Sequence, residues 1–419
     1  MSKDTFYTAV DIGTDKVTSI MARVGSEGEL KILGTGVVPS EGIQKGRIDN
    51  IDEVQVTVQS SLEEAQRYIG KGVLTGVYSS VSGNHISCLN TKEMIENLSD
   101  VGNISTQMLD RLLRGSFPEL NPGQEILHVI PIGYHVDGMT GVRNPVGLHG
   151  SHVEVEAHVV LGDVAVLKNT VKVIEANKAT VKSLVLHSLA SAEATLTGDE
   201  REMGVVLADI GAGTTDVIIY RQGNPWYSAV IPVGGNQLTR DLSVALRSSI
   251  YMAEEMKIKW GSVNPEAVPA DEEVVIPSFQ GEPKRVISRR ELAEPLNARM
   301  FEILKLVLMK VRQAGLREIP TGGLVLTGGG ADISGLAGLV QKMLGVPVRI
   351  AHPEGISGLP VQLRKPAFSA AVGLLLWGIK HQGETQSSFV NGDRSRVGNK
   401  SWRWGLGNKQ QERRRVKVG

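Results

Sequence analysis

The chain has 419 residues, which is long enough for two or three domains with sizeable hydrophobic cores. Its hydrophobic content of 41% and charged content of 21% are ordinary for a soluble protein, and the longest apolar stretch, residues 366–379, is too short to span a bilayer. The single cysteine, Cys88, excludes an internal disulfide and favours a reducing compartment.

The formal net charge is zero, but the charge is unevenly distributed. Residues 394–419 hold nine Lys or Arg and one Glu, a net charge of +8, so residues 1–393 carry −8. An acidic body with a basic tail predicts an acidic partner for the tail, either a membrane or a nucleic acid.

The first part of the chain predicts an α/β unit with an insertion. Apolar, β-branched runs predict strands at 6–12, 17–24, 30–38 and 74–82, with a helix at 52–69 between the last two. Residues 83–157 have a different texture, with a short helix near 106–114 and two strand-like runs, EILHVIPIGYHVDG and SHVEVEAHVVLG. The unit resumes with a helix at 163–176, a strand at 181–186 and a helix at 188–197.

A second α/β unit begins with a strand at 205–210. Its other predicted elements are helices at 236–258, 288–314 and 335–343, a strand at 322–327, and a hairpin around VVIPSFQGEPKRVIS. Residues 382–400 are polar and predict a flexible linker.

One unusual turn occurs twice. Residues 6–24 (FYTAVDIGTDKVTSIMARV) and 205–223 (VVLADIGAGTTDVIIYRQG) each join two apolar runs through Asp-Ile-Gly and a Gly/Thr-containing turn. Backbone N–H groups in such a turn bind phosphate, and the carboxylate can hold a hydrated magnesium ion. One Asp-Ile-Gly is most often a plain turn. Two copies, with Asp11 and Asp209 198 residues apart, indicate two related halves that clamp phosphates between them.

Two further features fit a nucleotide site. Residues 324–331 (LVLTGGGA) are a buried strand ending in three glycines, where a flat ring or a ribose can lie against bare backbone. Glu254 and Lys257 share one face of a predicted helix and could grip a ribose. Taken alone, the first would be a tight turn and the second a solvated pair.

In this order and spacing, DIGTDK, DIGAGTTD and LTGGGA resemble the two phosphate motifs and the adenosine motif of the actin, chaperone and sugar-kinase superfamily. Within it the chain resembles the FtsA family of actin-like bacterial cell-division proteins, most specifically in EILHVIPIGYHVDG, GVRNPVGLHG and VEVEAHVV. The resemblance covers roughly residues 6–380. It implies an α/β, actin-like/ribonuclease H-like two-lobed ATPase fold with an inserted α+β subdomain in the first lobe.

The resemblance also divides the chain. It implies a first half at 1–82, completed by 158–200 and 366–381; an inserted subdomain at 83–157; a second half at 201–237, completed by 306–365, with a small subdomain at 238–305; a linker at 382–400; and a membrane-targeting tail at 401–419.

ATP and Mg²⁺ are the ligands that the resemblance implies. It assigns magnesium, held through water, to Asp11 and Asp209. The residues that match its nucleotide contacts are Gly13, Thr14, Lys16, Gly211, Gly213, Thr214, Thr215, Gly234, Gly235, Glu254, Lys257, Gly328, Gly329 and Gly330. Hydrolytic relatives tend to place a Glu or Gln where this chain has His187. We interpret His187 as a strand-end histidine without a catalytic duty, so the expected activity is at most a weak ATPase.

The expected partners follow from the same resemblance. The FtsZ C-terminal tail would dock on helix 288–305, with Arg289, Arg290, Arg299 and Glu302 as candidate contacts. Other copies of the chain would form a polymer, and later division proteins would bind the inserted subdomain. Anionic inner-leaflet lipids would hold the tail at the cytoplasmic side of the cell membrane, at the division septum.

The tail supplies its own signal for that membrane. Trp402, Trp404 and Leu406 stand beside basic residues, a composition suited to a lipid headgroup layer, although Gly405 and Gly407 would interrupt a helix. Set beside the resemblance, this composition favours a membrane over a nucleic acid as the acidic partner.

Other functions of the same superfamily stay open. A small-molecule kinase would need a substrate loop with an aspartate base, and no such loop is evident in the sequence. A chaperone ATPase would need a substrate-binding domain after residue 380. A pilus-assembly adaptor of the PilM type would share the inserted subdomain, and GVRNPVGLHG and the basic tail argue against it.

Overall fold

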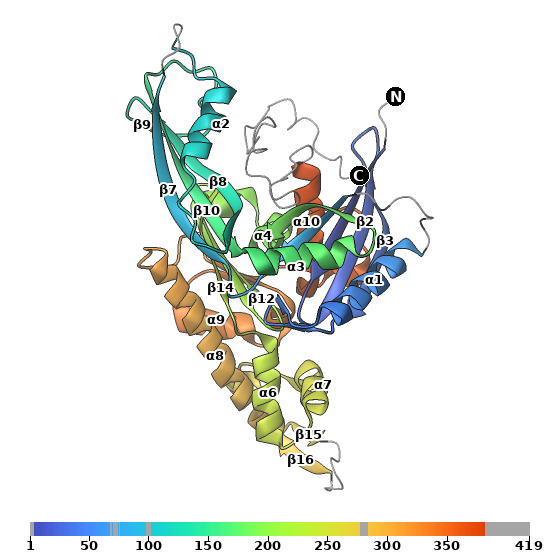
Figure 1. The fold of residues 1–419 in the computed structure, drawn as a ribbon. Helices are drawn as coiled ribbons and strands as arrows, with labels where there is room; N and C mark the ends of the chain where they lie inside the picture. The colour runs from blue at the N-terminus through green and yellow to red at the C-terminus, as the bar shows by residue number, and fades with distance from the viewer. Residues whose placement is uncertain are drawn as a thin grey trace.

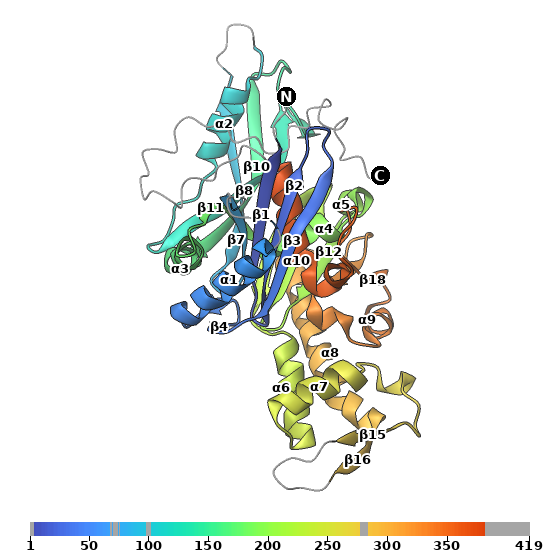
Figure 2. The same cartoon turned by 90° about the vertical axis from the view of Figure 1, so that its right-hand side faces the viewer.

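The computed structural model describes residues 4–67, 69, 74, 76–97, 102–276 and 284–381. Two five-stranded sheets form the body of the molecule (Figure 1). An inserted subdomain and a small subdomain lie at opposite ends of this body in both views (Figures 1 and 2). The molecule is therefore a two-lobed α/β protein with an inserted α+β subdomain, as the sequence predicts.

The first sheet has the strand order β11-β6-β1-β2-β3. Strands β1, β2 and β3 are antiparallel neighbours, whereas β6 and β11 run parallel to β1. Helices cover both faces, which explains why the central strands β1 and β6 are buried along nearly their whole length. The elements are β1 (Thr5–Ile12), β2 (Lys16–Val24), β3 (Leu30–Pro39), β4 (Ile43–Gln44), β5 (Arg47–Ile48), α1 (Ile51–Gln66), β6 (Gly76–Val81), α3 (Val164–Glu175), β11 (Thr180–Leu186) and α10 (Ser369–Lys380).

The second sheet repeats this design in the order β14-β13-β12-β17-β18. Its first three strands are antiparallel, and β17 and β18 run parallel to β12, so β12 corresponds to β1 and β13 to β2. The repeat in the sequence is thus a repeat of the whole sheet. The elements are α4 (His187–Thr195), α5 (Gly198–Met203), β12 (Val205–Ile210), β13 (Thr215–Arg221), β14 (Asn224–Ile231), β17 (Leu324–Thr327), α9 (Leu336–Leu344) and β18 (Val348–Ile350). Short 3-10 turns lie at Pro265–Ala267, Gly329–Asp332, Val361–Arg364 and Pro366–Phe368.

The helix predicted at 188–197 ends earlier. Thr197 lies outside α4 and caps the next helix, α5, because its side chain accepts a hydrogen bond from Glu200 N while the Glu200 carboxylate accepts one from Thr197 N. This reciprocal pair is a capping box, and it fixes the start of a helix that the sequence analysis did not predict.

The inserted subdomain is a separate four-stranded sheet with one helix. The order is β7-β10-β8-β9, and α2 covers one face with Leu109, Leu112 and Leu113. These leucines join a hydrophobic core distinct from the cores of the two halves. The elements are β7 (Ser87–Glu96), α2 (Thr106–Gly115), β8 (Gln124–Val136), β9 (Met139–Val142) and β10 (His152–Asp163).

The small subdomain corrects one prediction. Residues 236–258 do not form one helix but two, α6 (Gly235–Leu246) and α7 (Ile250–Trp260). Arg247 takes a left-handed conformation with φ 50°, and the Ser249 side chain then caps α7 by accepting from Met252 N. The predicted hairpin is present as β15 (Glu273–Ile276) and β16 (Arg285–Ser288), followed by the long α8 (Arg289–Gln313).

Two expectations concern membranes. Across the ranges that the structure describes, no helix combines the length and apolar character needed to cross a bilayer. The predicted linker 382–400 and the tail residues Trp402, Trp404 and Leu406 lie outside the described residues.

Candidate functional site

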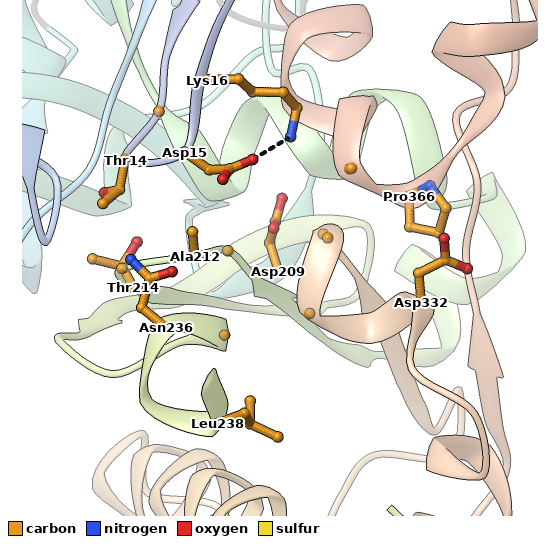
Figure 3. A pocket seen from close by; sticks show the side chains of 18 of the residues that line it. Thr14, Asp15, Lys16, Asp209, Ala212, Thr214, Asn236, Leu238, Asp332 and Pro366 are labelled. Carbon is orange, nitrogen blue, oxygen red and sulfur yellow. Dashed lines mark ion pairs between the residues drawn. The ribbon is translucent and has the colours of Figure 1, made fainter. Parts of the chain in front are cut away.

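A cavity of about 440 Å³ lies where the two halves meet. This volume is typical of a pocket for a small ligand or cofactor. Its walls come from the β1–β2 turn, the β12–β13 turn, the start of α6, the end of α7 and the turn after β17 (Figure 3). Both copies of the repeated turn therefore face one space, as the sequence predicts for a phosphate clamp.

Each of the two turns is closed by an equivalent backbone hydrogen bond. Gly13 N donates to Lys16 O at 3.0 Å, and Gly211 N donates to Thr214 O at 2.8 Å. A Cβ on Gly13 would lie 2.9 Å from Lys16 O, and one on Gly211 would lie 3.1 Å from Thr214 O. Both turns therefore keep glycine at the same place for the same reason: the closing carbonyl leaves little or no room for a side chain.

The turns also approach each other across the cavity. A Cβ on Gly213 would lie 2.6 Å from Thr14 Oγ1, so the second turn passes the first with no room for a side chain. Lys16 lines the same space, with its Nζ 3.9 Å from Asp15 Oδ2 (Figure 3). Bare amides, a hydroxyl and one lysine ammonium together suit an anionic ligand such as a polyphosphate.

Three buried aspartates lie beside these turns, and each accepts a hydrogen bond from a serine. Asp11 and Asp209 end β1 and β12, and Asp216 stands directly opposite Asp209 on β13. Serine side chains hold each carboxylate in a fixed orientation. Ser80 Oγ donates to Asp11 at 2.5 Å, Ser82 Oγ donates to Asp216 at 2.7 and 2.9 Å, and Ser191 Oγ donates to Asp209.

His187 lies among these aspartates. Its Nε2 is 3.7 Å from Asp11 Oδ1, and its Nδ1 is 3.7 Å from Asp209 Oδ2 and 3.8 Å from Asp216 Oδ2. Burial alone would lower the pKa of His187, but the charges of Asp209, Asp216 and Asp11 together raise it to about 9. His187 directly follows strand β11, as the sequence predicts, and it lines the cavity as an imidazolium. That it has no catalytic duty stays a prediction.

Burial acts on the aspartates as well. It raises the pKa of Asp216 to about 6 against the opposing charge of His187, and it raises the pKa of Asp209, to which the charge of Asp11 adds. Carboxylates crowded in this way gain from a further cation nearby. The centre thus carries three acids balanced by one imidazolium and, at the cavity wall, Lys16.

The residues present fit a magnesium nucleotide. Magnesium prefers oxygen ligands and is commonly held by one or two carboxylates, with water and substrate phosphates completing the shell. Asp11 and Asp209 supply such oxygens beside the phosphate-binding turns. The buried Nδ1 of His187 has no hydrogen-bond partner within the described ranges, which leaves a donor open to water or to a ligand. Among the residues that the structure describes, no group of three or more His, Cys, Asp or Glu side chains could hold a metal ion directly.

Bare backbone also lines the other side of the cavity. Gly328 has φ +86°, and a Cβ there would lie 2.2 Å from Asp209 Oδ1. Gly329 and Gly330 continue this wall into a 3-10 turn. Opposite them, Lys257 Nζ donates to Glu254 Oε2 and to Thr239 Oγ1, both at 2.8 Å. The predicted Glu254–Lys257 pair therefore exists and faces the cavity.

Two predicted contacts do not line the cavity. Thr215 is fully buried, and its Oγ1 donates to Val233 O at 2.9 Å. Gly234 lies behind the second turn, where a Cβ would be 2.5 Å from Gly211 O. In the structure both residues help to hold the second turn. All other predicted nucleotide residues line the cavity.

The four candidate partner contacts do not lie on one surface patch but have different surroundings. Arg299 pairs with Asp241 on α6 at 2.5 Å and with Glu302 at 2.5 Å, so these two lie together on the small subdomain as expected. Arg290 donates to Val268 O at 2.7 Å. Arg289 lines the cavity.

Sequence reasoning missed Asp216 and the three serines. An aspartate directly before the apolar run VIIY was a usable signal, because a buried charge there needs a partner. Ser80 and Ser82 stand in the segment VYSSVSGNHI but gave no local sign of their role.

Two family models match this chain. The family model described as "Cell division protein FtsA" matches residues 206–373, and "SHS2 domain inserted in FTSA" matches residues 83–161. The cell division protein FtsA of Pseudomonas aeruginosa is 35% identical over 91% of each chain. That of Escherichia coli (strain K12) is 34% identical over 92% of this chain and 91% of its own.

Solved structures share the fold at low identity. The PilM–PilN type IV pilus biogenesis complex matches with a TM-score of 0.63 and 16% identity, covering 89% of this chain and 98% of that one. An MreB of Spiroplasma citri bound to AMPPNP matches with a TM-score of 0.54 and 14% identity, covering 90% and 97%. These likenesses show an actin-like fold, and the closer relatives name the family: this chain belongs to the FtsA family of cell division proteins.

Proposed function

We propose that this protein is an ATP-binding, actin-like division protein that polymerises and anchors the FtsZ ring to the cytoplasmic membrane. The observation that carries the proposal is the pair of matched turns facing each other across Asp11 and Asp209 in a chain of the FtsA family. An MreB structure of the same fold holds AMPPNP, which supports the same ligand class here.

In this proposal, different residues of the cavity bind different parts of the ligand. The amides of the two turns and Lys16 bind the phosphates, and Asp11 and Asp209 hold magnesium through water. When bound, magnesium would neutralise phosphate charge beside the acidic centre. His187 places a cation where a water-activating residue would need to accept a proton, so we expect slow hydrolysis at most.

The partner surfaces belong to other parts of the molecule. We place the FtsZ tail on the small subdomain, around Arg299 and Glu302, and later division proteins on the inserted subdomain. A MamK structure of the same fold is a double helical filament, which supports head-to-tail assembly of this chain. Membrane attachment through anionic inner-leaflet lipids falls to Trp402, Trp404, Leu406 and the basic residues around them.

A pilus-assembly adaptor is the second candidate. The structural likeness to the PilM–PilN complex favours it, but that likeness rests on 16% identity. Membership of the FtsA family at 34–35% identity over nine-tenths of the chain favours division.

Co-sedimentation with anionic liposomes, with and without FtsZ and ATP, tests the proposal. The full chain should pellet with liposomes and carry FtsZ with it. A chain truncated after Ser387 should stay in the supernatant yet keep nucleotide binding, because every nucleotide motif precedes that point. Part of the binding should persist in high salt, since salt screens charge attraction but not inserted tryptophans. Full-length protein that ignores liposomes and instead shifts DNA in a gel would contradict the membrane role.

A further inference from the structure

Part of the cavity wall comes from outside the phosphate-binding turns. It includes residues from the end of α7, from the segment after the three glycines, and from the start of α8. The backbone joins the first two, because Val263 N donates to Ser334 O at 2.9 Å. From the start of α8, Arg289 lines the cavity. The sequence analysis had assigned this residue to a partner surface.

The guanidinium of Arg289 is held in place from two sides. Its Nε donates to Trp260 O at 2.9 Å, and its Nη1 donates to both carboxylate oxygens of Glu272 at 2.9 Å. The Arg289 side chain is 22% exposed, so these bonds are partly shielded from water. A planar cation fixed at its edge offers its face to whatever enters the cavity.

Apolar side chains that suit a flat ring line the same cavity as this cation. Leu238, Ile258 and Ile333 line the same cavity, and Ile258 is 75% exposed although it is a large hydrophobic residue. Figure 3 shows Leu238 on the side of the cavity away from Lys16. A phosphate group belongs at the Lys16 side, where the bare amides are, so the opposite side is left for the less polar part of a ligand.

We infer that Arg289 is a base-contacting residue, its guanidinium stacking on the purine of the nucleotide bound in the cavity. Arginine stacks on aromatic rings through both its charge and its planarity, and the contact strengthens where water is excluded. This inference rests on the proposed nucleotide function and adds to it the residue that reads the base end.

The neighbouring arginine provides a matched control. Arg290 also begins α8, is also partly buried and also donates to a backbone carbonyl, that of Val268. It does not line the cavity. Replacing either residue removes the same charge from the same helix turn. Arg289 differs from Arg290 in lining the cavity and in its ion pair with Glu272.

The experiment compares Mg·ATP with Mg·tripolyphosphate as competitors of a fluorescent ATP analogue on the full chain. Arg289→Ala should weaken ATP about tenfold, the loss of one partly desolvated stacking contact, and leave tripolyphosphate within twofold. Arg290→Ala should leave both unchanged. Arg289→Lys, which keeps the charge but not the plane, should resemble Arg289→Ala, and matching melting temperatures should show that the variants are folded.

A photolabelling measurement decides the case if tripolyphosphate binds too weakly to compare. 2-Azido-ATP carries its reactive group on the base and should label a peptide containing Arg289 in the wild type and in Arg290→Ala. Labelling confined to other peptides, or ATP binding by Arg289→Ala equal to the wild type, would overturn the inference while leaving nucleotide binding intact. Equal loss of ATP and tripolyphosphate would place Arg289 at the phosphates instead. A wild-type chain that binds no ATP would defeat the proposed function itself.

Discussion

At the scale of single residues, the three glycines after β17 differ in what surrounds them. A Cβ on Gly328 would collide with Asp209 and the backbone of Ile210, and one on Gly330 would lie 2.5 Å from Ile210 Cγ2. At Gly329 the nearest atom is Ala367 Cβ, at an ordinary 3.5 Å. Gly328 and Gly330 are needed for the chain to fold around the site, whereas Gly329 leaves room that the ligand can use.

Gly329→Val should therefore keep its fold and lose its ligand. We expect a melting temperature close to that of the wild type and no measurable ATP binding, because the added methyl groups fill the cavity that Gly329 lines. Gly328→Ala should instead lower stability by about 1–3 kcal/mol, through the positive φ and the clash. Thermal unfolding and calorimetric titration measure both effects. ATP binding by Gly329→Val at wild-type affinity would show that this wall does not face the nucleotide.

At the scale of elements, strand β14 joins the second half to the inserted subdomain. His158 on β10 contacts Asn90 at 2.8 Å and Ser228 on β14 at 2.9 Å, and Asn90 Nδ2 donates to Trp226 O. Because the Asn90 amide nitrogen is already donating, its oxygen faces His158 and accepts from Nδ1. Burial lowers the pKa of His158 to about 4, so His158 is a neutral imidazole at the interface.

This histidine predicts a pH dependence of stability. The unfolded chain takes up a proton near pH 6.5 and the folded chain only near pH 4, so the contribution of His158 is present above pH 6.5 and is lost as the pH falls toward 4. His158→Gln removes that titration. The unfolding free energy of the wild type should fall relative to the variant by up to about 3 kcal/mol over this window. Parallel urea unfolding curves at pH 7 and pH 4 measure it, and a constant gap between the two proteins would contradict a neutral buried His158.

The elements also show what the sequence can predict. Strands, most helices and the paired turns follow from local patterns: apolar runs, capping residues and glycines that a tight turn requires. The break at Arg247 was missed because it depends on one residue in a left-handed conformation. The pairing of Ser82 with Asp216, 134 positions apart, was missed because only the folded chain brings those residues together.

At the scale of the whole molecule, the account depends on two halves closing on one ligand. Each half contributes one turn and the aspartate that precedes it, Asp11 or Asp209, and the turns approach closely at Gly213 and Thr14. A ligand held by only one half would leave the other turn without a role. Substitutions in either half should therefore weaken the affinity for the nucleotide.

Calorimetric titration of Mg·ATP into two variants tests this claim most directly. Lys16→Ala removes a cation of the first half, and Asp209→Ala removes a carboxylate of the second. Lys342→Ala, an exposed residue paired with Glu266 outside the cavity, is the control. We predict one site in the wild type and in the control, at least tenfold weaker binding in Lys16→Ala, since a hydrogen bond between charged groups contributes about 1.5–3 kcal/mol, and none detectable in Asp209→Ala. Wild-type affinity in either of the two cavity variants would contradict a nucleotide clamped between the halves.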